Sequence, residues 1–289
     1  MEESKLRSDG KAAPDKIEPR KPADVIMKQQ VEAGLGELHR STMGLLITGL
    51  AAGLELGFSL FFMAVMLTYE QGALPRPIHE FLLAHMYTIG FIFVIVGRSE
   101  LFTEHTTTAV MPVLHGQASI RQLARLWGLI YVANLVGEAI FSGIAVLAGP
   151  SLGVIDPNAF SVLASRVVNH SWWVILLSAI LAGWLMGLLA WLVTAARDTI
   201  SQVIVIWLVI SVIGFSHLHH VISGTGEVLS GLFAGQGISW GDFGHFLLWA
   251  TLGNSIGGVV FVAALKHGYA REENKDQPPS EEQGSASKE

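Results

Sequence analysis

The chain has 289 residues, of which 51% are hydrophobic and only 15% are charged, well below the roughly 25% that is typical of a soluble domain. Of its 18 lysines and arginines, eight precede Ser41 and four lie from Lys266 onward, so the composition excludes an ordinary soluble protein and predicts a membrane domain with polar ends. The net charge of −6 says little about partners because the acids are also concentrated in the tails, and the absence of cysteine excludes disulfides, thiolate metal sites and cysteine nucleophiles.

The polar ends divide the chain into three predicted parts. Residues 1–40 form a cytoplasmic N-terminal arm that is partly disordered, residues 41–268 form a six-helix transmembrane domain, and residues 269–289 form a disordered cytoplasmic tail. Within the arm, residues 23–40 carry a partial apolar stripe, which fits either a helix lying on a membrane or a plain linker. The arm lacks the apolar stretch of a signal peptide.

Six apolar units follow one another in the central part, and two of them are interrupted by polar and ionisable residues. The interruptions are 100–108 in the second unit and 214–220 in the fifth. A lipid-exposed helix does not tolerate such a break, because its freed N–H and C=O groups would have no water to bond. Two breaks deep in a bundle therefore indicate a lined cavity, which is a pore, a binding site or a metal centre. The units are 43–68, 81–114, 124–148, 172–195, 199–234 and 244–265.

Two coincidences in the sequence predict an internal repeat. The segments Asn134-Leu-Val-Gly and Asn254-Ser-Ile-Gly lie 120 residues apart, and the breaks at Thr103 and His217 lie 114 apart. Three spans followed by three spans enter the membrane from opposite sides, so the halves would form an inverted repeat. Chance similarity between glycine-rich helices is the alternative. With six spans, the basic residues favour a cytoplasmic position for both ends.

Several short motifs, in the same order and spacing, resemble those of the formate/nitrite transporter family. They are Gly97-Arg-Ser-Glu-Leu-Phe-Thr103, Ala133-Asn-Leu-Val-Gly137, Gly214-Phe-Ser-His217 and Gly253-Asn-Ser-Ile-Gly-Gly258. The resemblance covers about residues 40–268. It implies an all-α, aquaporin-like protomer whose six transmembrane helices form a 3+3 inverted repeat, with helices 2 and 5 broken at mid-membrane.

The resemblance also implies a function, a location and partners. Members of the family conduct small monovalent anions such as formate and nitrite, so the chain is expected to be an anion channel or transporter, not an enzyme, in the plasma (inner) membrane. The expected partners are the lipid bilayer, the anion and further copies of the chain in a homopentamer with one pore per subunit, with no nucleic acid. No catalytic residue, metal or cofactor is implied.

On this resemblance, His217 is the central pore histidine, and Thr103 lies in the loop of the second helix and faces the pore. A bare anion pays a large desolvation cost in a narrow apolar gate, whereas a histidine at that point can exchange a proton or a hydrogen bond with it near neutral pH. Ser216 takes the place of a glutamate that precedes the histidine in the family. Leu101 and Phe102 would form one apolar constriction and Ile210 another.

A second group of residues is expected to support the site. Glu100 would brace the loop of the first break and Arg98 would pair with a carboxylate, while glycines would permit close helix packing. At Gly183 the family commonly has an asparagine that steadies the histidine. The expected structural residues are Glu100, Arg98, Asn134, Asn254, Gly257 and Gly258.

Three alternatives remain open. The departures at Ser216 and Gly183 leave room for a transport-inactive or regulatory relative. A histidine-rich membrane metalloenzyme is a second alternative, although His217-Leu-His-His220 does not have the spacing that places ligands one helical turn apart. A neutral-solute channel is the third, but the paired Asn-Pro-Ala loops it needs are absent. The sequence identifies neither the anion nor whether passage is passive or proton-coupled.

Overall fold

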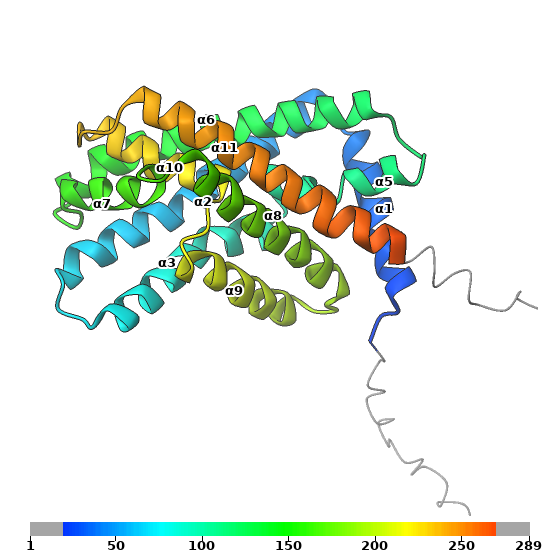
Figure 1. Ribbon diagram of the computed structural model, residues 1–289, viewed down its shortest axis with the longest axis horizontal. Helices are drawn as coiled ribbons and strands as arrows, with labels where there is room; N and C mark the ends of the chain where they lie inside the picture. Colours follow the sequence, from blue (N-terminus) through cyan, green and yellow to red (C-terminus); the bar gives the residue numbers. More distant parts are fainter. Residues whose placement is uncertain (1–19, 270–289) are drawn as a thin grey trace, which may run out of the picture.

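The computed structural model describes residues 20–269, and this part of the chain is entirely helical (Figure 1). The terminal stretches predicted to be disordered lie largely outside the described residues. The helices are α1 (Ala23–Leu38), α2 (Thr42–Glu70), α3 (Arg76–Gly97), α4 (Phe102–His105), α5 (Val110–Leu114), α6 (Ile120–Ser151), α7 (Pro157–Val168), α8 (Trp172–Ala195), α9 (Thr199–Phe215), α10 (Val221–Phe233) and α11 (Trp240–Gly258), which continues as the π-helical segment η1 (Val259–Ala264).

Among the described residues, five helices are long and apolar enough to cross a membrane: α2, α3, α6, α8 and the continuous helix Trp240–Tyr269, which contains α11 and η1. The expectation of an all-α protein with several apolar spans is confirmed. The predicted second unit is α3 followed by the short pieces α4 and α5, and the predicted fifth unit is α9 followed by α10. Both α9 and α10 are apolar, but each is too short to be a span by itself.

The helices α6 and α11 begin in the same way. Ser119 accepts a hydrogen bond from the N–H of Gln122, whose side chain accepts one from the N–H of Ser119. Ser239 and Asp242 form the same reciprocal pair at the start of α11, 120 residues later. These capping boxes satisfy N–H groups that the first helical turn leaves unpaired.

Two helix pairs cross closely, α2 with α6 and α8 with α11. In the second crossing, a Cβ atom at Gly183 would lie only 2.2 Å from the carbonyl oxygen of Asn254. A side chain therefore cannot occupy position 183 without separating the helices. This packing requirement gives a physical reason for glycine where the family commonly has asparagine.

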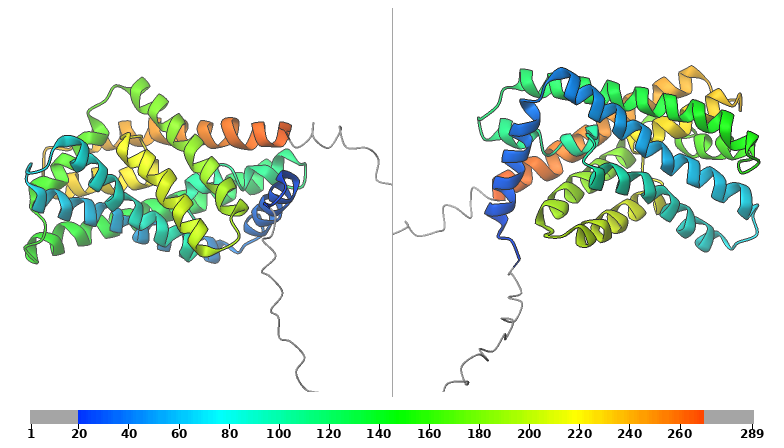
Figure 2. Two further views of the ribbon diagram at one scale, coloured as in Figure 1. Left: turned by 90° about the horizontal axis from the view of Figure 1, so that it is seen from below. Right: turned by 180° about the vertical axis from the view of Figure 1, so that it is seen from behind.

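Helix α1 packs against the bundle instead of standing apart from it. Its apolar side is buried against α5, α6 and α8, and Lys21 just before it donates to the carbonyl oxygen of Thr194 at 2.6 Å. Gln30 donates to the hydroxyl of the same threonine at 3.1 Å. In all three views α1 lies at the same end of the molecule as the end of η1 (Figures 1 and 2).

Helix α7 was expected to be part of a loop between spans. It lies at the other end of the molecule from α1 (Figure 1) and packs on α10. Its start does carry a sequence signal, because Asp156 caps the N–H of Asn158 and Pro157 occupies the first helical position. A search for long apolar units misses a helix of only 12 residues.

Candidate functional site

The first break separates α3 from α4. Arg98 ends α3 in the left-handed conformation, with a φ of 62°. Ser99 then bonds back to the carbonyl of Val94 at 3.0 Å, and Leu101 is extended and begins α4. The chain thus turns within a few residues and buries Thr103, which has no exposed surface.

The second break separates α9 from α10 with the same sequence of steps. His217 ends α9 in the left-handed conformation, with a φ of 50°. Leu218 bonds back to the carbonyl of Ile213 at 3.0 Å, and His220 is extended and caps α10. Arg98 therefore corresponds to His217, and Leu101 to His220, with an offset of 119 residues.

One asparagine holds each break. Asn134 of α6 accepts a hydrogen bond from the N–H of Phe102 at 2.9 Å and donates to the carbonyls of Gly49 and Glu100. Asn254 of α11 repeats this arrangement, because it accepts from the N–H of Val221 at 2.8 Å and donates to the carbonyls of Ala179 and His219. Both asparagines are fully buried. Each satisfies backbone groups that the break removes from helical bonding.

The two breaks meet at a bond between Thr103 and His220, where the Thr103 Oγ1 atom lies 2.8 Å from His220 Nε2. The other ring nitrogen, Nδ1, accepts from the backbone N–H of Ser223 at 3.2 Å. A neutral imidazole has one donor and one acceptor nitrogen, so Nε2 carries the proton and donates to Thr103. The threonine hydroxyl proton is then free to be donated to a third group.

His217 lies elsewhere. Its Nε2 atom is 3.2 Å from Glu80 Oε2, and 40% of its side chain is exposed. The physical reason is the backbone: His217 is the left-handed residue that ends α9, and the chain needs three more residues to reach the cap of α10. The imidazole that the structure brings to Thr103 is that of His220. Ser216, beside His217, is exposed.

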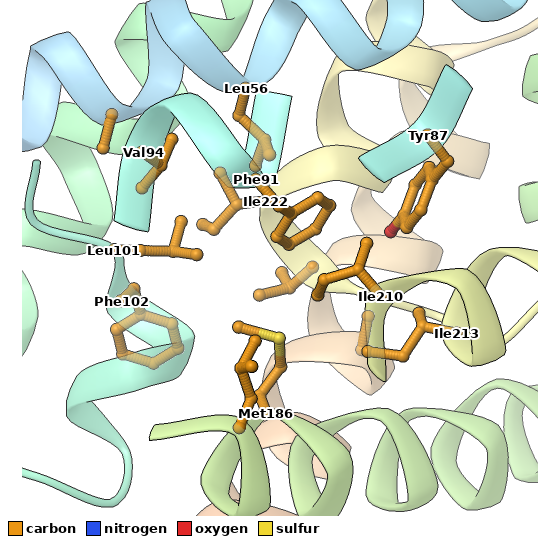
Figure 3. Close-up of a cluster of buried hydrophobic side chains, with 14 of the residues drawn as sticks. Leu56, Tyr87, Phe91, Val94, Leu101, Phe102, Met186, Ile210, Ile213 and Ile222 are labelled. Atoms are coloured by element: carbon orange, nitrogen blue, oxygen red, sulfur yellow. The ribbon is translucent and has the colours of Figure 1, made fainter. Parts of the chain in front are cut away.

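A cluster of buried apolar side chains (Figure 3) includes Phe91, which contacts His220. The Phe91 ring meets the His220 ring edge-on with centroids 5.0 Å apart. Leu101 and Ile210, the two residues expected to form constrictions from opposite halves of the chain, both belong to this cluster and have no exposed surface. The labelled members are Leu56, Tyr87, Phe91, Val94, Leu101, Phe102, Met186, Ile210, Ile213 and Ile222.

Phe102 and Gly258 fix the first break from its other side. The Phe102 ring packs against the rings of Trp127 and Tyr131 on α6, at centroid distances of 5.8 and 4.9 Å. A Cβ atom at Gly258 would lie 2.1 Å from Thr106 Oγ1, so this glycine lets the break contact α11. Gly257 similarly leaves no room for a side chain beside the carbonyl of Ile180.

A cavity of about 50 Å³ opens on the α7 side of the cluster. We call it the α7 cavity. His220 borders it together with His217, and Arg166 of α7 lies in its wall. Arg166 donates to Glu80 at 3.1 Å, so the charged groups at this cavity are tied together. The polar side chains of its lining include those of Tyr87, Arg166, His217, His220 and Glu227.

A larger cavity of about 590 Å³, which we call the α1 cavity, lies on the other side. Arg40 donates to both Glu37 and Glu100, and the second carboxylate oxygen of Glu100 bonds to His105. Burial raises the pKa of Glu37, and its bond from Arg40 opposes that shift. Glu100 is therefore bonded both to Arg40, between α1 and α2, and to His105 at the end of α4. Arg98 lines the same cavity and interacts electrostatically with Glu104.

Helix α3 gives the length of the apolar barrier between the cavities. Tyr87 borders the α7 cavity and Ile95 borders the α1 cavity. Between them, Phe91 and Val94 are fully buried in the apolar cluster. Eight residues of helix cover about 12 Å, so a short apolar segment separates two polar cavities.

Comparison with known proteins supports a family assignment. The family model described as formate/nitrite transporter matches residues 24–268. This chain belongs to the formate/nitrite transporter family. It is 32% identical over 255 residues to the inner membrane protein YfdC of Escherichia coli, covering 86% of this chain and 79% of that protein. It is 26% identical over 240 residues to the nitrite transporter NirC of Salmonella typhimurium, covering 82% and 87%.

Solved structures share the fold. A chain described as an FNT family ion channel matches with a TM-score of 0.72 at 23% identity, over 86% of this chain and 99% of that one. A pentameric formate channel with formate bound matches with a TM-score of 0.68 at 21% identity, over 81% and 98%. The membrane-transporter family and the helical channel fold expected from the sequence are confirmed.

Sequence reasoning assigned no place in the pore to three buried residues that lie in this region, His220, Glu138 and Glu227. His220 was passed over because the family motif was matched at His217, although His220 is the residue directly before the apolar start of α10. Glu138 and Glu227 are single acids within apolar helices, and neither is part of a motif, although Glu138 directly follows the motif that ends at Gly137. Between residues 20 and 269, no three His, Cys, Asp or Glu side chains come together as a set that could hold a metal ion.

Proposed function

We propose that each protomer forms a pore for small monovalent anions of the formate and nitrite type, with Thr103 and His220 at its centre. The Thr103–His220 bond carries this proposal, because it joins the two broken helices between two polar cavities. Family membership supports the class of substrate. The relatives are named as transporters and channels, which supports a transport protein over an enzyme.

The chemistry follows from the direction of that bond. The His220 Nε2–H donates to Thr103, so the threonine hydroxyl donates its own proton to an anion that reaches the centre. The surrounding apolar side chains make passage of a bare anion costly. Passage as the neutral weak acid lowers that cost. In this proposal Leu101, Phe102 and Ile210 form the apolar constrictions, and His217 with Glu80 and Arg166 lies at the entrance from the α7 cavity.

The larger assembly is also part of the proposal. The matching capping boxes and asparagine bonds of the two halves support an inverted repeat of three and three spans, with α9 and α10 together forming one span. The pentameric formate channel of similar fold supports a homopentamer. We propose a place in the inner membrane with both ends cytoplasmic, in which the α1 cavity opens to the cytoplasm.

The test is anion flux into proteoliposomes that contain the purified full-length protein, with formate, nitrite, hydrosulfide, acetate and lactate compared at acidic and alkaline pH. The decisive variants are His220→Asn and His217→Asn. Asparagine is favoured at a helix N-cap and tolerated in the left-handed conformation, so each variant suits its backbone. At position 220 the shorter side chain keeps the cap and loses its reach to Thr103.

We expect His220→Asn to lower the flux by about 100-fold, the range that a lost positioned proton or hydrogen-bond donor produces. His217→Asn should stay within about threefold of the wild type, a difference of less than 1 kcal/mol. The reverse ranking would restore His217 as the central histidine. A wild-type protein that transports none of the five anions would favour the transport-inactive alternative.

A further inference from the structure

Two buried glutamates lie where α6 packs against α10, Glu138 on α6 and Glu227 on α10. Glu138 of α6 has no exposed surface, and neither of its carboxyl oxygens has a hydrogen-bond partner. A Cβ atom at Gly226 would lie 2.2 Å from Glu138 Oε2, so this carboxyl group lies directly against the backbone of α10. The next residue of α10 is Glu227, whose carboxyl group interacts electrostatically with that of Glu138.

The two glutamates differ in their access to water. Glu227 lines the α7 cavity, where His220 and Arg166 also lie. Glu138 is sealed behind it, and Ser142 of the same helix donates to the carbonyl of Gly226 at 3.1 Å, which holds α6 and α10 together at this level. The pair is therefore a buried carboxyl group connected to the cavity through a second, accessible one.

Few other charged or titratable groups act on this pair. Tyr87 of α3 interacts electrostatically with both carboxyl groups. Arg166 of α7 interacts with Glu227, while His217 and His220 border the same cavity. Among the described residues, α2, α4 and α11 add no charge that acts on either glutamate.

We propose that Glu138 and Glu227 together hold a proton, and that Glu227 exchanges it with a weak-acid anion in the α7 cavity. A buried carboxylate without a hydrogen-bond partner is strongly unfavourable, and two adjacent buried carboxyl groups do not both ionise. Glu138 stays neutral, which leaves Glu227 as the group that gains and loses the proton beside the cavity.

This role complements His220. Both ring nitrogens of His220 already form hydrogen bonds, Nδ1 with Ser223 and Nε2 with Thr103. Protonating Nδ1 would break the hydrogen bond that it accepts from the Ser223 N–H, which caps α10. In the exchange, the O–H bond of Glu227 breaks, an O–H bond forms on the anion, and the anion becomes the neutral acid. The Glu227 carboxylate that remains lies near Arg166 and takes a proton back from water in the cavity.

The inference rests on the proposed function for the identity of the anion, but the proton site can be tested without transport. Infrared difference spectra of the purified full-length protein, recorded between acidic and alkaline pH without any anion substrate, report the C=O stretch of a protonated carboxyl group. We expect a titrating band in the wild type, its loss in Glu227→Gln and its return in Glu227→Asp. The matched control is Glu55→Gln, because Glu55 also has a buried carboxyl oxygen without a partner but lines neither cavity.

Flux measurements then test the role of the proton. Glu227→Gln should lower anion flux at about pH 6 by about tenfold and remove most of its dependence on pH. Glu138→Gln should keep both flux and pH dependence, because glutamine resembles the neutral carboxyl group. An equal loss in both variants would reduce the pair to a structural role and overturn the proposal.

The two proposals fail in different ways. A titrating Glu227 band in a protein that carries no anion would uphold the proton site and reject the transport function. Transport without any band that depends on Glu227 would reject the proton site alone. Flux that requires sodium, with a band that titrates only when sodium is absent, would assign a cation to the pair and overturn its assignment to a proton.

Discussion

The break before α4 and the break before α10 hold their backbones in matching ways but differ in their side chains. Each has a left-handed residue, an extended cap and one asparagine that makes three hydrogen bonds. On this common backbone, Glu100 corresponds to His219 and Leu101 to His220. The first break supplies a carboxylate tied to α1, whereas the second supplies the imidazole that contacts Thr103. The backbone arrangement thus creates the cavity-lining site, and its chemistry depends on which side chains occupy equivalent positions.

The largest expected effect comes from replacing the asparagine that stabilises each break. Asn134→Ala and Asn254→Ala each leave one buried N–H and two buried carbonyls without their side-chain partner, which we expect to cost about 3 kcal/mol or more. Thermal unfolding of the purified protein in detergent measures this loss. Asn158→Ala is the control, since that side chain is exposed at the start of α7. If one asparagine variant kept the stability of the wild type while the other was strongly destabilised, the two breaks would not be stabilised in the same way.

A smaller effect is expected from changing Thr103, a side chain that differs between the two breaks. Thr103→Val removes the hydroxyl group at nearly constant shape and leaves His220 Nε2–H without its acceptor, so we expect about a tenfold loss of flux, equivalent to about 1.4 kcal/mol. Thr103→Ser should retain the flux. Ile222, the residue that corresponds to Thr103 in the second break, provides the control, and Ile222→Val should change stability by about 1 kcal/mol with little change in flux. Equal flux in the threonine and valine proteins would remove Thr103 from the site.

Much of the fold was predictable because its physical signals are local. The apolar units and the two polar interruptions follow from composition, and Asn134 and Asn254 stood out through their spacing of 120 residues. The place of His220 was harder to predict, because it depends on how many residues the chain needs between a left-handed helix end and the next cap. Measured from Thr103 to His217 the offset is 114 residues, whereas the structure aligns the breaks with an offset of 119, near that of the asparagines.

Other features depended on contacts that no sequence pattern reports. Glu138 directly follows the motif Ala133–Gly137, but its contact with the backbone of Gly226 appears only when α6 packs against α10. The hydrogen bond between Arg40, which follows α1, and Glu100 of the first break likewise joins residues 60 positions apart. Gly183 could be noticed as a departure, but its reason is the distance to Asn254 in the folded helix pair.

The smallest expected effect concerns the starts of α6 and α11. Ser119→Ala and Ser239→Ala each remove one half of a capping box, which should cost about 1 kcal/mol, whereas the corresponding glycine variants should lose only a few tenths. Because the two caps lie on different helices, the double variant should lose the sum of the single losses. Thermal unfolding of the four alanine and glycine variants and the double variant tests this. A much larger loss of stability at one cap would mean that this serine makes further stabilising interactions besides the cap. The two halves would then differ at their helix starts as well as in the side chains of their breaks.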